Sequence, residues 1–161
     1  MFNELNIKGI LATSLNVLAS AAFSYFLTYS LTNNNDALNL VANVFSILSG
    51  FLLLVITMSG ENSTIMNGLS LLDAANQERR FLMRFTKYYM LFLLYILTLA
   101  LIFIFYLLSK DTQNKNEYFL FLKSFIGYSI SFLTCFSFIQ STFIPLKIKA
   151  LFEEKKELSK K

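Results

Sequence analysis

The sequence has few of the residues that carry enzyme chemistry or that shape a fold rich in turns. Among its 161 residues there is no His, no Trp, one Cys, one Pro and five Gly. Without His and with a single Cys, one chain lacks the ligands of a zinc site, the His ligands of a haem and a Cys–His nucleophile pair. It also cannot form an internal disulfide, and it has too little Gly and Pro for the turns of an all-β fold. We therefore expect no enzymatic activity, no metal centre and no cofactor.

Charge is scarce as well. Only 15% of the residues are charged, 55% are hydrophobic, and the mean hydropathy is +0.55. Long apolar runs cover residues 9–31, 37–59, 88–109 and 119–144. Each is close to or above the roughly 20 residues that a helix needs to cross about 30 Å of hydrocarbon. The sequence therefore predicts an all-α integral membrane protein: one membrane domain over residues 1–161, built as a four-helix bundle.

The cations are distributed unevenly between the two ends of these predicted helices. Of the 14 Lys and Arg residues, Lys110, Lys115 and Lys123 fall at one end and all the others fall at the opposite end. Because loops rich in Lys and Arg stay in the cytoplasm, this bias places both termini and residues 60–87 there. We expect a multi-pass protein of the inner, cytoplasmic membrane.

A basic cluster precedes the third span, in the stretch NQERRFLMRFTKYYM. It consists of Arg79, Arg80, Arg84 and Lys87. The last three follow the spacing i, i+4, i+7 and so share one face of a helix. This predicts a cytoplasmic helix that begins near Leu69 and continues into the third span. Besides anchoring the topology, the basic cluster would bind anionic lipid headgroups or an acidic protein surface, and the sequence does not separate these two.

Small and polar residues recur along the first two spans. The candidate positions are Asn16, Ser20, Ser24, Asn43, Ser46 and Gly50. In lipid, close backbone approach and interhelical hydrogen bonds mark the faces on which helices meet. Two interpretations stay open at this point, namely packing between helices or the lining of a pore between subunits.

The third span has few polar residues, so we expect it to face lipid most fully while the other three form the inner packing. No charged residue lies in the central part of any span, which argues against ion-coupled transport. After Pro145 the tail, residues 145–161, is predicted to form a short amphipathic cytoplasmic helix.

The passage SILSGFLLLVITMSG, followed by a loop and by ERRFLMRFTKYY, resembles the small four-span membrane proteins of bacterial antiphage defence. The membrane subunit of the Kiwa system and the phage exclusion protein RexB have a comparable layout. The resemblance covers about residues 45–95 in detail and the four-span plan overall. It implies a homo-oligomeric inner-membrane protein that senses envelope disturbance and works with a cytoplasmic effector, or that permeabilises the membrane. It implies no catalytic residue.

Three functional hypotheses follow. The first is a membrane component of an antiphage system that docks a cytoplasmic effector through the basic cluster and the tail. The second is a pore or depolarising ion channel, in which Asn16, Ser20 and Ser24 line the path. The third is an immunity or superinfection-exclusion protein that occupies another membrane protein. The expected partners are membrane lipids, further copies of the chain and a soluble effector, with no direct nucleic-acid binding.

Overall fold

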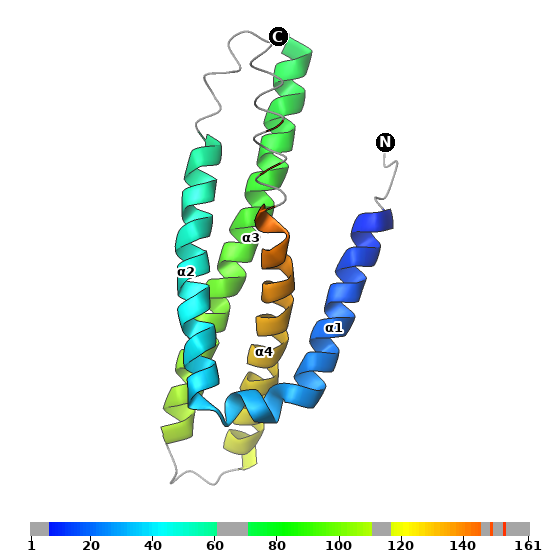
Figure 1. Ribbon diagram of the computed structural model, residues 1–161. Coiled ribbons are helices and arrows are strands. Elements are labelled where there is room, and N and C mark those ends of the chain that lie inside the picture. The colour runs from blue at the N-terminus through cyan, green and yellow to red at the C-terminus, as the bar shows by residue number, and fades with distance from the viewer. Residues whose placement is uncertain (1–6, 61–70, 111–116, 146–148, 150–152, 154–161) are drawn as a thin grey trace.

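The computed structural model describes residues 7–60, 71–110, 117–145, 149 and 153, and these form an all-α structure (Figure 1). Its helices are α1 (Ile7–Thr32), α2 (Asn35–Gly60), α3 (Leu71–Lys110) and α4 (Glu117–Thr142). Each contains a stretch that is long and apolar enough to cross a membrane. The candidate spans are Gly9–Thr32, Asn35–Thr57, Phe85–Lys110 and Glu117–Thr142. The prediction of four such helices is confirmed.

A two-residue connection turns the chain from α1 into α2. The main-chain N–H of Asn33 donates to the carbonyl oxygen of Tyr29 over 3.1 Å and closes α1. Asn34 then caps α2, because its side-chain oxygen accepts a hydrogen bond of 3.1 Å from the N–H of Ala37. Asp36 in the first turn of α2 is favourable at the positive end of the helix dipole. This local chemistry forces α1 and α2 to run in opposite directions.

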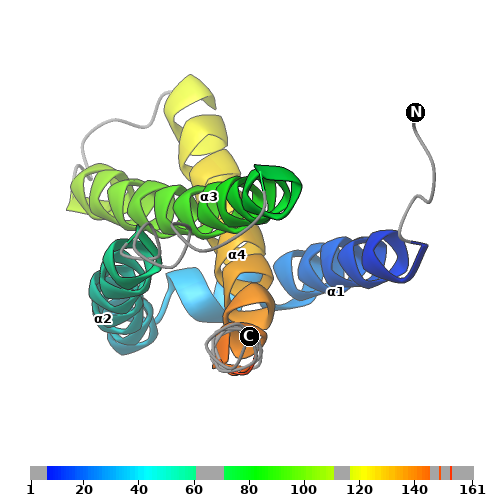
Figure 2. The same cartoon turned by 90° about the horizontal axis from the view of Figure 1, so that it is seen from above.

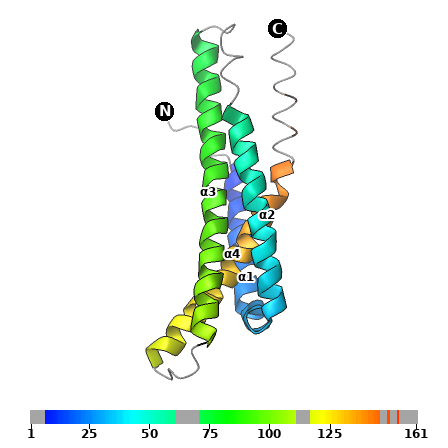
Figure 3. The same cartoon turned by 90° about the vertical axis from the view of Figure 1, so that its left-hand side faces the viewer.

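Because the helices alternate in direction, α1 and α3 begin at the same end of the molecule at which α2 and α4 end (Figure 1). We call this the basic end, since it holds the basic cluster. The start of α3 extends past the other three helices there, as Figures 1 and 3 show. Its candidate span begins at Phe85, so residues 71–84 lie ahead of the span and cover about 21 Å at 1.5 Å per residue. Residues 61–70 of the predicted cytoplasmic segment 60–87, including the predicted helix start near Leu69, and most of the predicted tail at 145–161 lie outside the described residues.

Helices α2, α3 and α4 pack around a group of aromatic rings. Phe45 on α2 stacks on Tyr95 of α3 with 5.0 Å between ring centroids, and both side chains are fully buried. Phe138 on α4 lies 5.1 Å from the Phe45 ring on another side. The hydroxyl of Tyr95 lies 2.5 Å from Oγ of Ser141, which also belongs to α4. These contacts join three helices at a single place in the core.

The expectation that the third span faces lipid most fully is wrong. Helix α3 packs extensively against both α2 and α4, whereas α1 packs mainly on α4 and is the outermost helix in the end view of Figure 2. In the most apolar stretch of α1, 17% of the residues are buried, against 22% in α3. The buried side chains of α3 are Tyr88, Leu91, Tyr95, Thr98, Ile102 and Phe105. They alternate at spacings of three and four residues, which is the seam that two neighbouring helices bury.

The last turns of α1 change direction and run past α4 toward the start of α2 (Figures 1 and 2). Along this helix, hydroxyl side chains donate to main-chain carbonyl oxygens four residues earlier: Thr28 to Ser24, and Thr32 to Thr28 over 2.8 Å. Ser and Thr hydroxyls that bond in this way compete with the main-chain N–H groups for the carbonyl oxygens, and such bonds often bend helices. Both bonds lie in the last turns of α1, where the helix changes direction.

Candidate functional site

The polar residues of α1 lie against α4 of the same chain. Asn16, Ser20 and Ser24 are 3%, 0% and 8% exposed. The amide nitrogen Nδ2 of Asn16 donates to the main-chain oxygen of Phe136 over 3.3 Å, and Oγ of Ser24 donates to that of Tyr128 over 2.9 Å. Ser20 donates over 2.8 Å to the carbonyl oxygen of Asn16 and stays within α1. In this structure, then, the α1 residues pack two helices together, and they do not reach the surface of the chain.

A glycine on α4 allows this close approach. A Cβ added at Gly127 would lie 3.2 Å from Cγ2 of Thr32 and 3.7 Å from Cγ2 of Thr28. The same atom would lie 3.7 Å from Cε2 of Phe105 on α3. Gly127 is therefore a point at which α1 and α3 both come near the α4 backbone, as expected of small residues at helix contacts in lipid.

The candidate residues on α2 are placed differently. Asn43, Ser46 and Gly50 are all exposed. Helical register puts Asn43 and Gly50 on the side of α2 opposite the buried side chains of Phe45 and Leu52. A Cβ added at Gly50 would have no atom within 4 Å, so nothing in the described chain packs there. We call this surface of Asn43, Ser46 and Gly50 the open α2 face.

The basic cluster is spread along the start of α3. Arg79 and Lys87 are exposed. Arg80 and Arg84 lie on the same uninterrupted helix and share the face of Lys87 by register; their side chains are outside the described residues. With Phe85 as the start of the span, Arg79 lies about 9 Å before it and Lys87 about 3 Å after it. The four cations therefore differ in depth relative to the apolar part of the helix.

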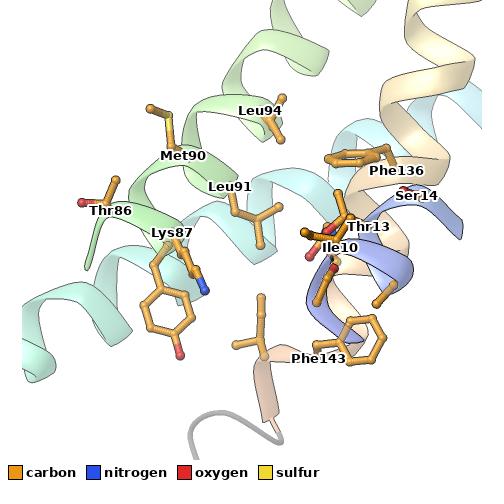
Figure 4. A pocket seen from close by; sticks show the side chains of 15 residues that line it. Ile10, Thr13, Ser14, Thr86, Lys87, Met90, Leu91, Leu94, Phe136 and Phe143 are labelled. Carbon is orange, nitrogen blue, oxygen red and sulfur yellow. Dashed lines mark hydrogen bonds between the residues drawn. The ribbon is translucent and has the colours of Figure 1, made fainter. Parts of the chain in front are cut away.

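Lys87 also lines a cavity of about 870 Å³ at the basic end. The cavity is bounded by the first turns of α1, the start of the α3 span and the end of α4 (Figure 4). It exists because α1 and α3 each pack on α4 but have little contact with each other. In Figure 4 the side chains of Lys87 and Leu91 point across the cavity toward Ile10 and Thr13 of α1.

Sequence reasoning singled out Lys87 but missed the rest of this cavity. Phe136 and Gln140 of α4, and Phe143 directly after its end, line it from the third side. Their residue types are ordinary for a membrane helix, and the cavity arises from how the helices diverge. No local pattern in the sequence reports that divergence. Comparisons of the chain with protein-family models, curated proteins and solved structures give no match, so the site is assessed on its geometry alone.

Proposed function

We propose that this protein is a non-enzymatic membrane subunit that holds a soluble cytoplasmic effector at the inner membrane. The extension of α3 would be the docking element, and an acidic surface of the effector would bind it. The observation that supports this most is that α3 continues about 21 Å beyond its candidate span as one unbroken helix. A straight helix of this length presents its side chains at a fixed distance from the bilayer.

The distance of each cation from the start of the candidate span separates the cations that we expect to bind a protein from those that we expect to bind a lipid headgroup. Arg79 and Arg80 lie about 9 and 7.5 Å before Phe85, the first residue of the candidate span, whereas Lys87 lies within that span. Arg79 is exposed, and charge complementarity with an acidic protein surface both speeds encounter and selects the partner. We therefore assign docking to Arg79 and Arg80.

A second copy of this chain is the proposed occupant of the open α2 face. The side-chain amide of Asn43 makes no hydrogen bond to another described residue, and Asn43 lies in the middle part of a candidate span. An unpaired amide is costly in hydrocarbon, and helices in lipid meet where small residues let their backbones approach. Pairing of Asn43 and Gly50 with the same residues of a second copy would satisfy both conditions. This supports the homo-oligomer in the proposal.

The biological setting that we propose is antiphage defence, with the membrane subunit responding to envelope disturbance and the effector acting in the cytoplasm. Its support is the resemblance of residues 45–95 to four-span defence proteins. Expression of the chain with its neighbouring genes should lower phage plaque numbers. Equal plaque numbers with and without the chain, over a panel of unrelated phages, would remove this setting and leave the docking role to be judged separately.

The docking role is tested by purification of the tagged protein from its host in mild detergent, followed by native mass spectrometry. The variants are Arg79→Glu, Arg80→Glu and the two combined. The matched control is Lys110→Glu, an exposed cation at the opposite end of the same helix that receives the same change in charge. We expect a stoichiometric soluble protein with the wild type and with the control, and its loss in the double variant. Equal recovery of that protein with all variants would contradict docking through α3.

The pore hypothesis has less support, because Asn16, Ser20 and Ser24 are buried against α4 and donate their hydrogen bonds within the chain. A path lined by these residues would require α1 to leave α4. Liposomes that contain the pure protein should therefore stay tight to ions, as measured by dye release and by potassium flux.

A further inference from the structure

We propose that the cavity between α1, α3 and α4 binds one anionic phospholipid, with the lipid phosphate on the ammonium group of Lys87 and an acyl chain between α1 and α3. This assigns to Lys87 a role different from that of Arg79 and Arg80. It does not rest on the docking of an effector, because it concerns a cavity within the chain itself.

The walls of the cavity suit an acyl chain. Its apolar surface includes Ile10 on α1, Leu91 and Leu94 on α3, Phe136 on α4, and Phe143 directly after α4. Its volume of about 870 Å³ is within the range of about 300–1,000 Å³ found for sites that enclose small ligands. Leu91 is buried beneath the cavity while Ile10 is 51% exposed at its edge, so the space is deep on the α3 side and open on the α1 side.

The polar groups of the cavity suit an anion. Thr13 and Thr86 donate their hydroxyl protons to the main-chain oxygens of Gly9 and Leu82, over 2.9 and 2.8 Å. Their hydroxyls are thus already engaged as donors. The other lining side chains with donor groups are Ser14, Tyr88, Gln140 and Lys87, and among the lining residues only Lys87 carries a positive charge. No Asp or Glu is among the described residues that line the cavity, so the positive charge of Lys87 is not neutralised there.

The position of the cavity near the ends of the candidate spans favours a lipid as its occupant. Most of its lining residues belong to the candidate spans of α1, α3 and α4, close to the ends of those spans, and Phe143 and Ile144 directly follow the α4 span. Lys87 lies about 3 Å inside the start of the α3 span, at the level where a long cationic side chain reaches the headgroups. Arg84 precedes it by about one turn on the same helix face. A molecule with an anionic head at this level and a long apolar chain below it fits both parts of the cavity, and a phospholipid of the bilayer has that form.

The test uses the full chain, delipidated in mild detergent, with native mass spectrometry to count retained lipids. The probes are phosphatidylglycerol, phosphatidylcholine with the same acyl chains, and inorganic phosphate alone. We expect one phosphatidylglycerol per chain, preferred over phosphatidylcholine by about fivefold, which corresponds to about 1 kcal/mol for one Lys near an anionic surface.

Two variants test the binding of the lipid headgroup and the binding of its acyl chain separately. Lys87→Gln should remove the fivefold preference for phosphatidylglycerol, whereas Lys110→Gln, the same change at the other end of α3, should leave it intact. Thr13→Trp adds a large side chain from an exposed position of α1 and should reduce retention of both lipids. Circular dichroism of each variant establishes that the helices are retained.

Three outcomes would overturn the proposal. Equal retention of phosphatidylglycerol in the wild type, Lys87→Gln and Thr13→Trp would mean that the lipid is bound elsewhere on the surface. Equal retention of the two lipids by the wild type would mean that Lys87 does not select the headgroup. Binding of inorganic phosphate without retention of either lipid would mean that the cavity holds a free anion.

Discussion

The hydroxyl group of Ser24 on α1 donates a hydrogen bond of 2.9 Å to the main-chain oxygen of Tyr128 on α4. Eight residues earlier on α1, Asn16 makes the equivalent bond to Phe136, eight residues later on α4. The two bonds run in opposite order along the two helices, as required for an antiparallel pair. Since lipid supplies no hydrophobic force between helices, such bonds and close backbone contact hold α1 in place.

Replacement of Ser24 with Ala should destabilise the fold only modestly. Hydrogen bonds between membrane helices contribute about 0.6 kcal/mol on average and up to about 1.7 kcal/mol. We expect a loss in that range in the free energy of unfolding, measured by titration of the detergent-solubilised protein with sodium dodecyl sulfate. Ser30→Ala, at an exposed position of the same helix, is the control and should have no effect. Equal stability of all three proteins would show that the bond contributes nothing.

Substitutions at Gly127 should be costly in proportion to size. An added Cβ lies 3.2 Å from Cγ2 of Thr32, so Gly127→Ala requires Thr32 to move by a few tenths of an ångström. Gly127→Leu forces α1 away from α4, and overpacking of this kind costs about 1–3 kcal/mol. The same unfolding titration measures both variants. Gly50→Ala, studied at a dilution where the chain is monomeric, is the matched control, because a Cβ at Gly50 meets no atom within 4 Å.

Gly50→Ile should abolish association of the chain without unfolding it. The side chain would project from the open α2 face, where the chain leaves space, into the position that we assign to a second copy. Native mass spectrometry and chemical cross-linking in mild detergent should show monomers for Gly50→Ile and oligomers for the wild type. An unchanged oligomer would exclude the open α2 face as the contact.

Two substitutions at Tyr95 should separate the contribution of ring packing to stability from that of the hydrogen bond. Oγ of Ser141 donates its proton to the main-chain oxygen of Ser137, so the hydroxyl of Tyr95 is the donor in the 2.5 Å contact with Ser141. Tyr95→Phe keeps the stack on Phe45 and should lose about 0.6 kcal/mol, whereas Tyr95→Ala opens a cavity and should lose about 3–5 kcal/mol. Similar losses for the two variants in the unfolding titration would contradict this division.

The number and position of the four helices could be predicted from the sequence, because length and hydropathy alone decide whether a helix can cross a bilayer. The continuity of α3 through the basic cluster could be predicted as well, since Arg80, Arg84 and Lys87 keep a helical spacing that has no Gly or Pro within it. Whether the helices are inserted with the basic end in the cytoplasm stays a prediction.

The pairing of the helices could not be predicted in this way. Leu91 and Ile102 of α3 are buried, while Leu97 and Phe103 of the same helix are 48% and 63% exposed. All four side chains are apolar and equally compatible with a lipid environment. Composition does not separate a side chain that packs on protein from one that packs on lipid. The polar positions of α1 and α2 were equally ambiguous, and the structure buries Asn16 and exposes Asn43.

The pairing of α1 with α4 has a consequence for the synthesis of the protein. A ribosome releases α1 first and α4 last, so the hydrogen-bond partners of Asn16 and Ser24 do not yet exist while the middle of the chain is being made. In the membrane location that we propose, the amide of Asn16 and the hydroxyl of Ser24 would lack these partners until residues 117–142 are inserted. A chain that stops before residue 117 retains the α2–α3 pair but leaves α1 without the helix that it mainly packs on. The last helix thus completes the fold, because an incomplete chain leaves the amide of Asn16 and the hydroxyl of Ser24 without their partners on α4.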